Sequence, residues 1–401
     1  MTLRNLKFIT TYKRGNMKKL FLLALIGAFF IAANVEAQQG DVSNSTMDPK
    51  AATYYNSAIQ FMKSEQYENA LTSLDSSLII AKDYRIYYLQ GQANLKLGKT
   101  AEALTSFGES VKLNPDYDMG YMAIGNTHLA LKEYEQAIND FKKVTEVTKD
   151  ASTKEKAEES IKFSTNAQSI EFYNKGNELS KQSNFEEAIK NYDLALSISK
   201  DPKYYYQKSL ALSKLNKTKE AEDALNAAVA LDESFDLGYV ALANIQTTNK
   251  DYAGAVKNYE KALAVTKNDN LKTNIPDYIS KTYLVAGNNS YKDKKYDQSI
   301  EWMQKSVSTS PSDAAYLGLV KAFIEKKKYA DALTSLDSVK ALQKTVKDEA
   351  IAYYKGMVHL NKGEDSKAID NFTIALNDPS YKKASQSQID YIKAKQKGNK
   401  K

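Results

Sequence analysis

Small and large apolar residues recur along this 401-residue chain at a spacing typical of helices. From residue 51 to about residue 380, a small residue is followed 12 positions later by a second small residue. A large apolar residue stands 4 positions further on. Residues four apart lie on the same face of an α-helix. We therefore expect pairs of antiparallel helices that approach closely where the side chains are small.

The pattern occurs nine times along the chain. The second small residue is alanine in every copy but one, which has Ser299, and the first is missing only where Val320 replaces it. The large residues are Leu74, Phe107, Phe141, Tyr192, Leu225, Tyr259, Met303, Leu336 and Phe372. Because a single helix pair cannot bury its apolar face, neighbouring pairs must stack into an array.

These positions resemble the tetratricopeptide repeat, a helix pair of 34 residues. That family has an aromatic residue at position 4, small residues at positions 8, 20 and 27, and a large apolar residue at position 24. The copy that starts at residue 84 fits best, with Tyr87, Gly91, Ala103, Phe107 and Pro115 in place. The resemblance implies an all-α fold, a right-handed α-solenoid of about nine helix-turn-helix repeats. The repeats start at residues 51, 84, 118, 169, 202, 236, 280, 313 and 349.

The nine copies form three triplets, because extra residues follow the third and the sixth copy. We expect repeats 1–3 over 51–150, an inserted helix within 151–168, repeats 4–6 over 169–269, a linker over 270–279, and repeats 7–9 over 280–380. Residues 381–395 predict a capping helix, with Ser385, Ile389 and Ile392 on one face. Residues 38–50 are expected to be a disordered linker and 396–401 a basic tail. All six prolines fall at repeat boundaries, so we expect none inside a helix.

The N-terminal residues have the organisation of an export signal. Residues 17–19 (Met-Lys-Lys) are basic, residues 20–33 are an apolar run, and residues 35–37 (Val-Glu-Ala) place small side chains where a signal peptidase cleaves. The apolar run is short for a membrane span. We therefore expect a signal peptide over 1–37, with Met17 as an alternative start. The mature protein is expected in the periplasm or at the outer membrane of a Gram-negative bacterium.

Composition excludes several kinds of chemistry. The chain has no cysteine, so it has no disulfide, thiolate nucleophile or cysteine-ligated zinc. Its two histidines, His128 and His359, both occupy position 11 of a repeat, which favours packing over metal ligation. The tripeptide at 98–100 (Gly-Lys-Thr) lacks the earlier glycine of a phosphate-binding loop, because that position is Ala93. We expect no catalytic residue, no metal, no cofactor and no enzymatic activity.

The net charge of the chain also limits its partners. Of the net charge of +7, residues 1–37 carry +5, because they contain six basic residues and one acid. The mature chain is therefore close to neutral. Nucleic-acid binding depends on many contacts between basic residues and phosphates. We accordingly expect no nucleic acid among the partners.

The family resemblance implies that positions 2, 5, 9, 12 and 13 of each repeat line a concave groove in which partners bind. Tyrosine recurs at position 5, where it fits either packing or a binding face. Asparagine recurs at position 9, where it fits either a bond to a neighbouring side chain or a bond to the backbone of a bound peptide. Tyrosines at position 4, such as Tyr54 and Tyr239, are expected to pack between helices. The candidate groove residues are Tyr55, Arg85, Tyr88, Met122, Asn126, Tyr173, Asn177, Lys203, Tyr206, Asn244, Lys281, Asn288 and Lys321.

The expected groove positions are more basic than the rest of the mature chain. Lysines at position 13 are explained in part by the helix dipole, which favours cations in the last turn of a helix. The dipole does not explain Arg85, Lys203, Lys281 and Lys321. Our hypothesis is that these four residues receive an anionic partner, such as an acidic segment or a C-terminal carboxylate.

Together these observations predict a non-catalytic scaffold of the cell envelope that binds a protein or peptide partner in its groove. The alternative is a protein that binds glycan or peptidoglycan fragments through the groove tyrosines. The identity of the partner, membership of an envelope complex and the oligomeric state do not follow from the sequence.

Overall fold

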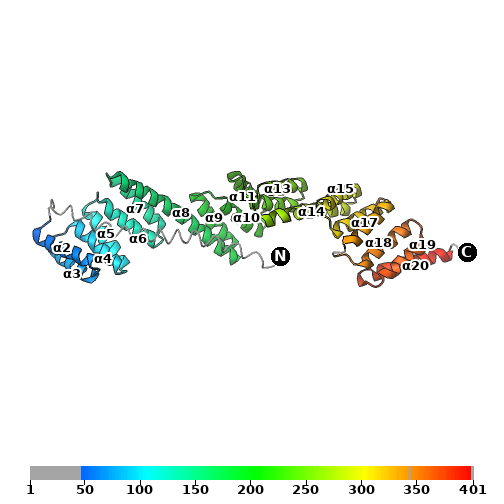
Figure 1. The fold of residues 1–401 in the computed structure, drawn as a ribbon, viewed down its shortest axis with the longest axis horizontal. Coiled ribbons are helices and arrows are strands. Elements are labelled where there is room, and N and C mark those ends of the chain that lie inside the picture. The colour runs from blue at the N-terminus through cyan, green and yellow to red at the C-terminus, as the bar shows by residue number, and fades with distance from the viewer. Residues whose placement is uncertain (1–46, 343–344, 399–401) are drawn as a thin grey trace. The chain divides into compact units, whose positions relative to one another are not determined.

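The computed structural model describes residues 47–342 and 345–398. The predicted signal peptide over 1–37 and most of the linker over 38–50 lie outside the described residues. The described residues form nineteen helices and no strand (Figure 1). The fold is an all-α solenoid of helix pairs, which confirms the predicted fold class.

Each repeat consists of a first and a second helix joined by a short turn. The first helices are α2 (Pro49–Lys63), α4 (Tyr84–Lys96), α6 (Asp118–Ala130), α8 (Ala151–Lys181), α10 (Pro202–Lys214), α12 (Asp236–Thr248), α14 (Asp269–Lys292), α16 (Asp313–Glu325) and α18 (Asp348–Asn361). The second helices are α3 (Tyr67–Ile80), α5 (Thr100–Leu113), α7 (Tyr134–Val147), α9 (Phe185–Ile198), α11 (Thr218–Leu231), α13 (Tyr252–Val265), α15 (Tyr296–Thr309), α17 (Tyr329–Leu342) and α19 (Asp365–Ala375). The chain ends on α20 (Pro379–Gly398).

The helices belong to two compact units. Unit 1 runs to Asn174 and includes Ser197–Ser199, while unit 2 comprises Lys175–Leu196 and the chain from Lys200 onward. In unit 1, helices α2 to α7 contact one another in chain order, and in unit 2 helices α10 to α20 do the same. First helices also contact the next first helix, as α14 contacts α16 and α16 contacts α18. The first helices therefore share one face within each unit.

The core of each repeat follows the predicted spacing. The alanine of the pattern is fully buried in every copy, and Ser299, which replaces it once, is also fully buried and donates a hydrogen bond to the carbonyl of Gly287 at 2.8 Å. The nine large residues are at most 3% exposed. A Cβ on Gly91 would lie 2.5 Å from the ring of Phe107, so the close approach of α4 and α5 requires a glycine there. These contacts confirm the predicted small and large positions.

The extra residues after the third and the sixth repeat do not have the predicted structure, because both segments extend a first helix. Residues 151–168 are not a separate helix but the beginning of α8, and residues 270–279 are not a linker but part of α14. Pro276 lies inside α14, so the expectation that no helix contains proline is wrong. The burial of Ile275 and Ile279 against α13 offsets the cost of a proline in the helix.

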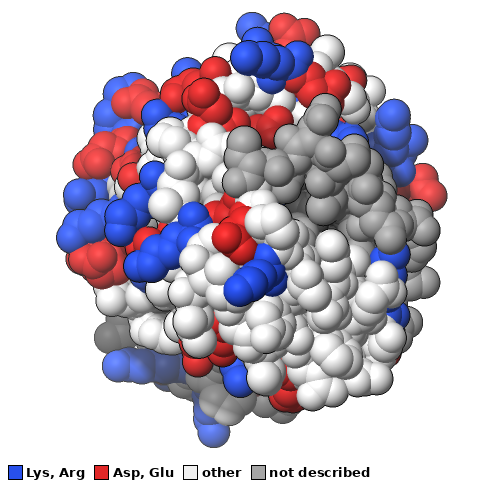
Figure 2. Space-filling model, turned by 90° about the vertical axis from the view of Figure 1, so that its left-hand side faces the viewer, with Lys and Arg blue, Asp and Glu red and all other residues white. Residues whose placement is uncertain are grey.

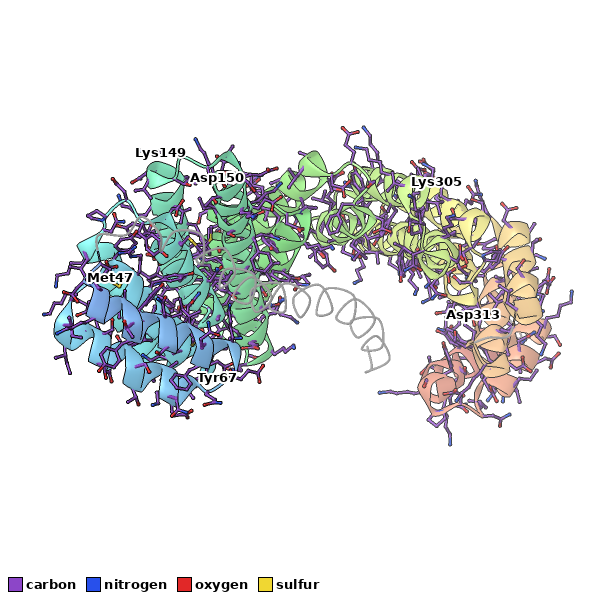
Figure 3. The ribbon with its side chains drawn as sticks, turned by 60° about the vertical axis from the view of Figure 1, so that its left-hand side comes forward. Met47, Tyr67, Lys149, Asp150, Lys305 and Asp313 are labelled. Atoms are coloured by element: carbon purple, nitrogen blue, oxygen red, sulfur yellow. The ribbon has the colours of Figure 1, made fainter. Side chains whose placement is uncertain are left out.

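The same anchored turn precedes both long helices. Thr148 donates a hydrogen bond to Asp118 at 2.6 Å, and Thr266 donates to Asp236 at 2.6 Å. Two residues after each threonine, Asp150 or Asn268 accepts backbone N–H bonds at the start of the long helix. Figure 3 shows Lys149 and Asp150 at this turn. The turn thus ends one triplet and starts the next helix in a fixed direction.

The ends of the array also differ slightly from the predicted boundaries. Helix α2 begins at Pro49 after the N-cap residue Asp48, so the expected linker 38–50 extends too far. On this end of the molecule, Figure 2 shows a broad uncharged area beside mixed charges. At the other terminus, α20 buries Ser385, Ile389 and Ile392 as predicted and continues to Gly398, so the first residues of the expected basic tail are helical.

Candidate functional site

Two of the tyrosines predicted to line the groove belong to the core. Tyr55 is 2% exposed and Tyr88 is 3% exposed, and the ring of Tyr88 packs against Phe107 and Tyr117. Adjacent helical positions point about 100° apart, so two neighbouring tyrosines can differ greatly in exposure. In the first repeat this residue is Tyr55, and Tyr54 is 44% exposed. The assignment of Tyr55 and Tyr88 to a partner-binding surface is therefore wrong.

The asparagines at position 9 divide into two kinds. Asn177 accepts a hydrogen bond from the hydroxyl of Tyr192 at 2.9 Å, and Asn244 accepts one from Tyr259 at 2.7 Å. Among the described residues, the side chains of Asn126 and Asn288 have no such bond, because position 24 of their repeats is Phe or Met. The amides at 177 and 244 thus have a packing role. The sequence signal is a tyrosine 15 residues after the asparagine.

The four cations proposed to receive an anion differ in their surroundings. Arg85 donates from Nε and Nη2 to Asp83 at 2.9 and 2.7 Å, so its charge is neutralised by the N-cap residue of its own helix. Burial disfavours the Asp83 carboxylate, but hydrogen bonds and the charge of Arg85 still hold the pKa of Asp83 below its usual value. Lys203 and Lys281 are exposed, whereas Lys321 is half-buried. Of the four, Arg85 is therefore the least suited to bind an anionic partner.

The other predicted groove residues lie at partly covered positions. Met122, Asn126, Tyr173 and Tyr206 are half-buried, and Asn288 is exposed. Tyr173 belongs to unit 1 and Tyr206 to unit 2.

A cluster that the sequence interpretation largely missed lies on the first helices of unit 2. We call it the tyrosine strip, and it comprises Tyr291, Tyr353, Tyr354 and Tyr381 with Lys321 and Glu325. Its members come from α14, α16, α18 and α20, which contact one another in that order.

Contacts within the tyrosine strip join all four helices. The Tyr291 hydroxyl donates to Glu325 at 3.3 Å. The Lys321 ammonium lies 5.7 Å from the ring centre of Tyr354. The ring centres of Tyr353 and Tyr381 are 4.9 Å apart, and those of Tyr354 and Tyr381 are 6.3 Å apart. All six side chains are half-buried or exposed, so the strip is a surface feature.

The surroundings of Tyr291 and Tyr354 keep these two phenols of the strip neutral. Burial, and next the charge of Glu325, raises the pKa of Tyr291 to about 12. Burial, and next the neighbouring Tyr381, raises the pKa of Tyr354 well above its usual value. Neutral phenols can both donate and accept hydrogen bonds beside the Lys321 charge. The strip can therefore hold a flat or apolar group together with a carboxylate.

The sequence contains a signal for part of this strip. Tyr291 is at position 12 of its repeat and Tyr353 is at position 5, and the family resemblance places both positions on the groove. Of the strip residues, however, only Lys321 is among the candidate groove residues. Tyr381 belongs to the capping helix and has no repeat position, so its approach to Tyr353 depends on how α20 packs.

No metal site is found in the described part of the chain, where no three His, Cys, Asp or Glu side chains converge. His128 Nδ1 lies 2.6 Å from Asp140 and His359 Nδ1 lies 2.8 Å from Glu364, so each histidine bonds a carboxylate of its own repeat. Among the residues that the structure describes, no helix has the length and hydropathy of a membrane span.

Sequence models of the tetratricopeptide repeat match the chain at residues 88–151 and at residues 172–202, 202–235 and 238–269. The matched segments coincide with the helix pairs from α4 to α13. Over these segments the chain is similar to tetratricopeptide repeat proteins, and the structure has the all-α solenoid fold expected of such repeats.

Several known proteins are similar to this chain. The Hsp70-Hsp90 organizing protein of Triticum aestivum is 26% identical over 230 residues, which are 52% of this chain and 39% of that protein. A BBSome complex member BBS4 homolog of Drosophila melanogaster is 24% identical over 322 residues, which are 73% of this chain and 63% of that protein. The chain spans less than two thirds of the length of each.

Solved structures of the same repeat class include two with high coverage of their own chains. PilF of Pseudomonas aeruginosa is 15% identical, with a TM-score of 0.34 over 56% of this chain and 99% of the other. The P58(IPK) TPR domain is 15% identical, with a TM-score of 0.31 over 88% of this chain and 99% of the other.

Proposed function

We propose that this protein is a non-catalytic scaffold that binds a protein or peptide partner on the tyrosine strip. The observation that carries this proposal is the chain of contacts that joins four phenols, Lys321 and Glu325 along α14, α16, α18 and α20. Tyrosine supplies a large, rigid contact surface with a polar end, and it is enriched at protein interfaces. The similarity to proteins named as chaperone organizers and as a member of a protein complex supports the same class of function.

The charge of Lys321 indicates which chemical group of the partner the strip would bind. Its ammonium lies over the ring of Tyr354 and forms no ion pair with another described residue. A carboxylate of the partner would pair with this charge in a setting from which the four phenols exclude part of the water. We therefore propose an acidic residue or a C-terminal carboxylate at this point of the partner.

The experiment is affinity capture from an envelope extract with wild-type protein and two matched variants. Lys321→Glu reverses the charge in the strip, and Lys272→Glu makes the same change at an exposed position near the start of α14. We expect one stoichiometric protein to be retained by the wild type and by Lys272→Glu, and to be lost from Lys321→Glu. Equal retention by all three proteins would refute the assignment of the strip.

The glycan alternative is tested with soluble wall oligosaccharides. Burial of Tyr55 and Tyr88 removes two of the rings on which this alternative depended. Saturable quenching of tyrosine fluorescence by the oligosaccharides, without a captured protein, would favour the glycan alternative over the scaffold.

We also propose that the protein is exported and acts in the periplasm or at the outer membrane. The proposal rests on the sequence of residues 17–37, with its basic start, apolar run and small residues before the cleavage point. Cell fractionation followed by intact-mass measurement tests it. A periplasmic species that starts at Gln38 supports export, and a cytoplasmic species that retains residues 20–33 contradicts it.

A further inference from the structure

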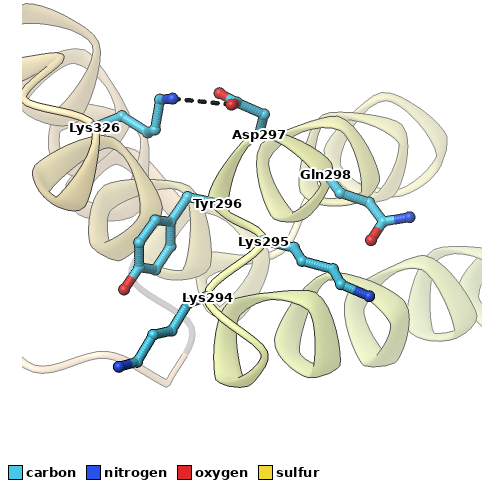
Figure 4. Close-up of a pocket in the computed structure, with 6 residues that line it drawn as sticks. All are labelled: Lys294, Lys295, Tyr296, Asp297, Gln298 and Lys326. Carbon is cyan, nitrogen blue, oxygen red and sulfur yellow. Dashed lines mark hydrogen bonds and ion pairs between the residues drawn. The ribbon is translucent and has the colours of Figure 1, made fainter.

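Lysines gather on one edge of unit 2, where the first and second helices of repeats 7 and 8 are joined. The two turns, 292–296 between α14 and α15 and 325–329 between α16 and α17, contain six lysines and two acids. We call these two turns the lysine edge. They are adjacent in space, because Lys326 of one turn pairs with Asp297, next to the other, at 2.9 Å (Figure 4).

The opposite edge of the same repeats has no such excess of lysine. There, the turn that joins repeats 7 and 8, residues 310–313, contains one acid, Asp313, and no lysine. The 14 residues of α15 separate the two edges by about 20 Å. In repeats 7 and 8, the excess of lysine is therefore on one edge.

The lysine edge is open to solvent and largely uncompensated. Lys292, Lys294, Lys295, Lys327 and Lys328 are exposed, and none of them forms an ion pair with another described residue. Lys294 and Lys327 have φ values of 60° and 57°, the left-handed conformation that turns the chain sharply between the two helices. As Figure 4 shows, Lys294, Lys295 and Lys326 line an open hollow of ≈ 340 Å³ together with Tyr296.

We propose that the lysine edge docks on a lipid bilayer with anionic headgroups, with the opposite edge of repeats 7 and 8 facing away from the membrane. This proposal goes beyond the proposed partner binding and does not depend on it. Two observations favour a bilayer over a nucleic acid. The basic residues of the edge are all lysines, whereas recognition of individual phosphates and bases favours the planar, bidentate arginine. Tyr296 and Tyr329 also lie half-buried on this edge, and tyrosine is the residue type that settles at membrane interfaces.

Magnitudes favour the bilayer over a second protein as well. Exposed ion pairs between proteins contribute little individually. A lysine near an anionic bilayer raises the partition coefficient by a factor of about five, and several lysines on one edge act together. Removing four of them should therefore weaken binding at least tenfold.

The test is co-sedimentation of the processed chain, residues 38–401, with large unilamellar vesicles. This chain keeps every described residue and omits the apolar run 20–33, whose own affinity for lipid would hide the effect. Vesicles of pure phosphatidylcholine are compared with vesicles that contain phosphatidylglycerol, at low and high salt. The edge variant carries Lys294→Glu, Lys295→Glu, Lys327→Glu and Lys328→Glu. The control variant carries the same charge change at exposed lysines on helices, Lys142→Glu, Lys154→Glu, Lys257→Glu and Lys272→Glu.

We expect salt-sensitive binding to the anionic vesicles, little binding to pure phosphatidylcholine, and at least a tenfold loss in the edge variant. The control variant should lose much less vesicle binding, because it has the same net charge as the edge variant but keeps the lysine edge. Equal losses in both variants, or no binding of the wild type to anionic vesicles, would overturn the proposal. Binding to inorganic polyphosphate but to no vesicle would also overturn it and make the edge a polyanion site. Circular dichroism of both variants is used to check that each is folded.

Discussion

The close contact between α4 and α5 makes a strong prediction for Gly91→Ala. The new Cβ would lie 2.5 Å from two ring atoms of Phe107, a distance that real Cβ contacts do not reach. Phe107 is fully buried and packs against Tyr88, so the ring has little room to move. Overpacking of this kind costs about 1–3 kcal/mol of unfolding free energy.

A matched control separates this cost from helix propensity. Gly108 lies on α5, and a Cβ there would meet nothing within 4 Å. Either glycine-to-alanine change gains up to about 1 kcal/mol of helix propensity. Gly108→Ala should therefore stabilise the protein, and the difference between the two variants is the overpacking cost.

The assay is urea unfolding followed by far-UV circular dichroism, with hydrogen exchange of the α4 amides to locate the effect. Hydrogen exchange is needed because repeat arrays can unfold in steps. We expect Gly91→Ala to be less stable than Gly108→Ala by about 1–3 kcal/mol. The penalty should shrink in a Phe107→Leu background, because the two residues are in contact. Equal stability of the two alanine variants would refute the packing argument.

Three further changes test other parts of the fold. Tyr192→Phe removes the hydroxyl that donates to the position-9 asparagine and should cost about 0.5–1.5 kcal/mol in urea unfolding; an unchanged midpoint would contradict a stabilising bond. The lowered folded-state pKa of Asp83 means that its pairing with Arg85 stabilises the protein above the unfolded pKa of about 3.9, and this contribution is lost as the pH falls through the folded-state value. As the pH is lowered, the free energy of unfolding of Asp83→Asn should therefore fall less than that of the wild type. Identical pH profiles would contradict a stabilising role of the Asp83–Arg85 pair. Pro276→Ala should raise the melting temperature, because alanine restores a helical N–H. Trp302 fluorescence reports the transition, since its ring stacks on Tyr283 of α14. An unchanged melting temperature would mean that the proline is accommodated without cost, and a lower one would mean that it stabilises the protein.

The sequence predicted the repeat core well because that core depends on local spacing. Position 20 and position 24 lie on one helix, and position 8 lies on the helix that directly precedes it, so one short segment specifies their contact. The burial of Ala103 and Phe107 against Gly91 is an example. The capping helix was predictable for the same reason, since Ser385, Ile389 and Ile392 define one face by themselves.

The candidate site was less predictable, because repeat position does not fix which neighbouring side chain turns inward. Tyr54 and Tyr55 are adjacent and chemically identical, and only the packing of α2 against its neighbours decides that Tyr55 is buried. Likewise, the partner of Arg85 is two residues away in sequence, yet the bidentate geometry depends on Asp83 capping α4.

By itself, the sequence determined the helix pairs, their number and their internal contacts, because a helix pair is short and its contacts lie within one repeat. Only the tertiary structure decided the features that cross repeats. Ile275 and Ile279 extend α14 through Pro276 because α13 covers them. The tyrosine strip and the lysine edge form because stacking brings residues about 30 to 90 positions apart to one surface. Such contacts depend on how each pair packs on the next, which no single repeat specifies.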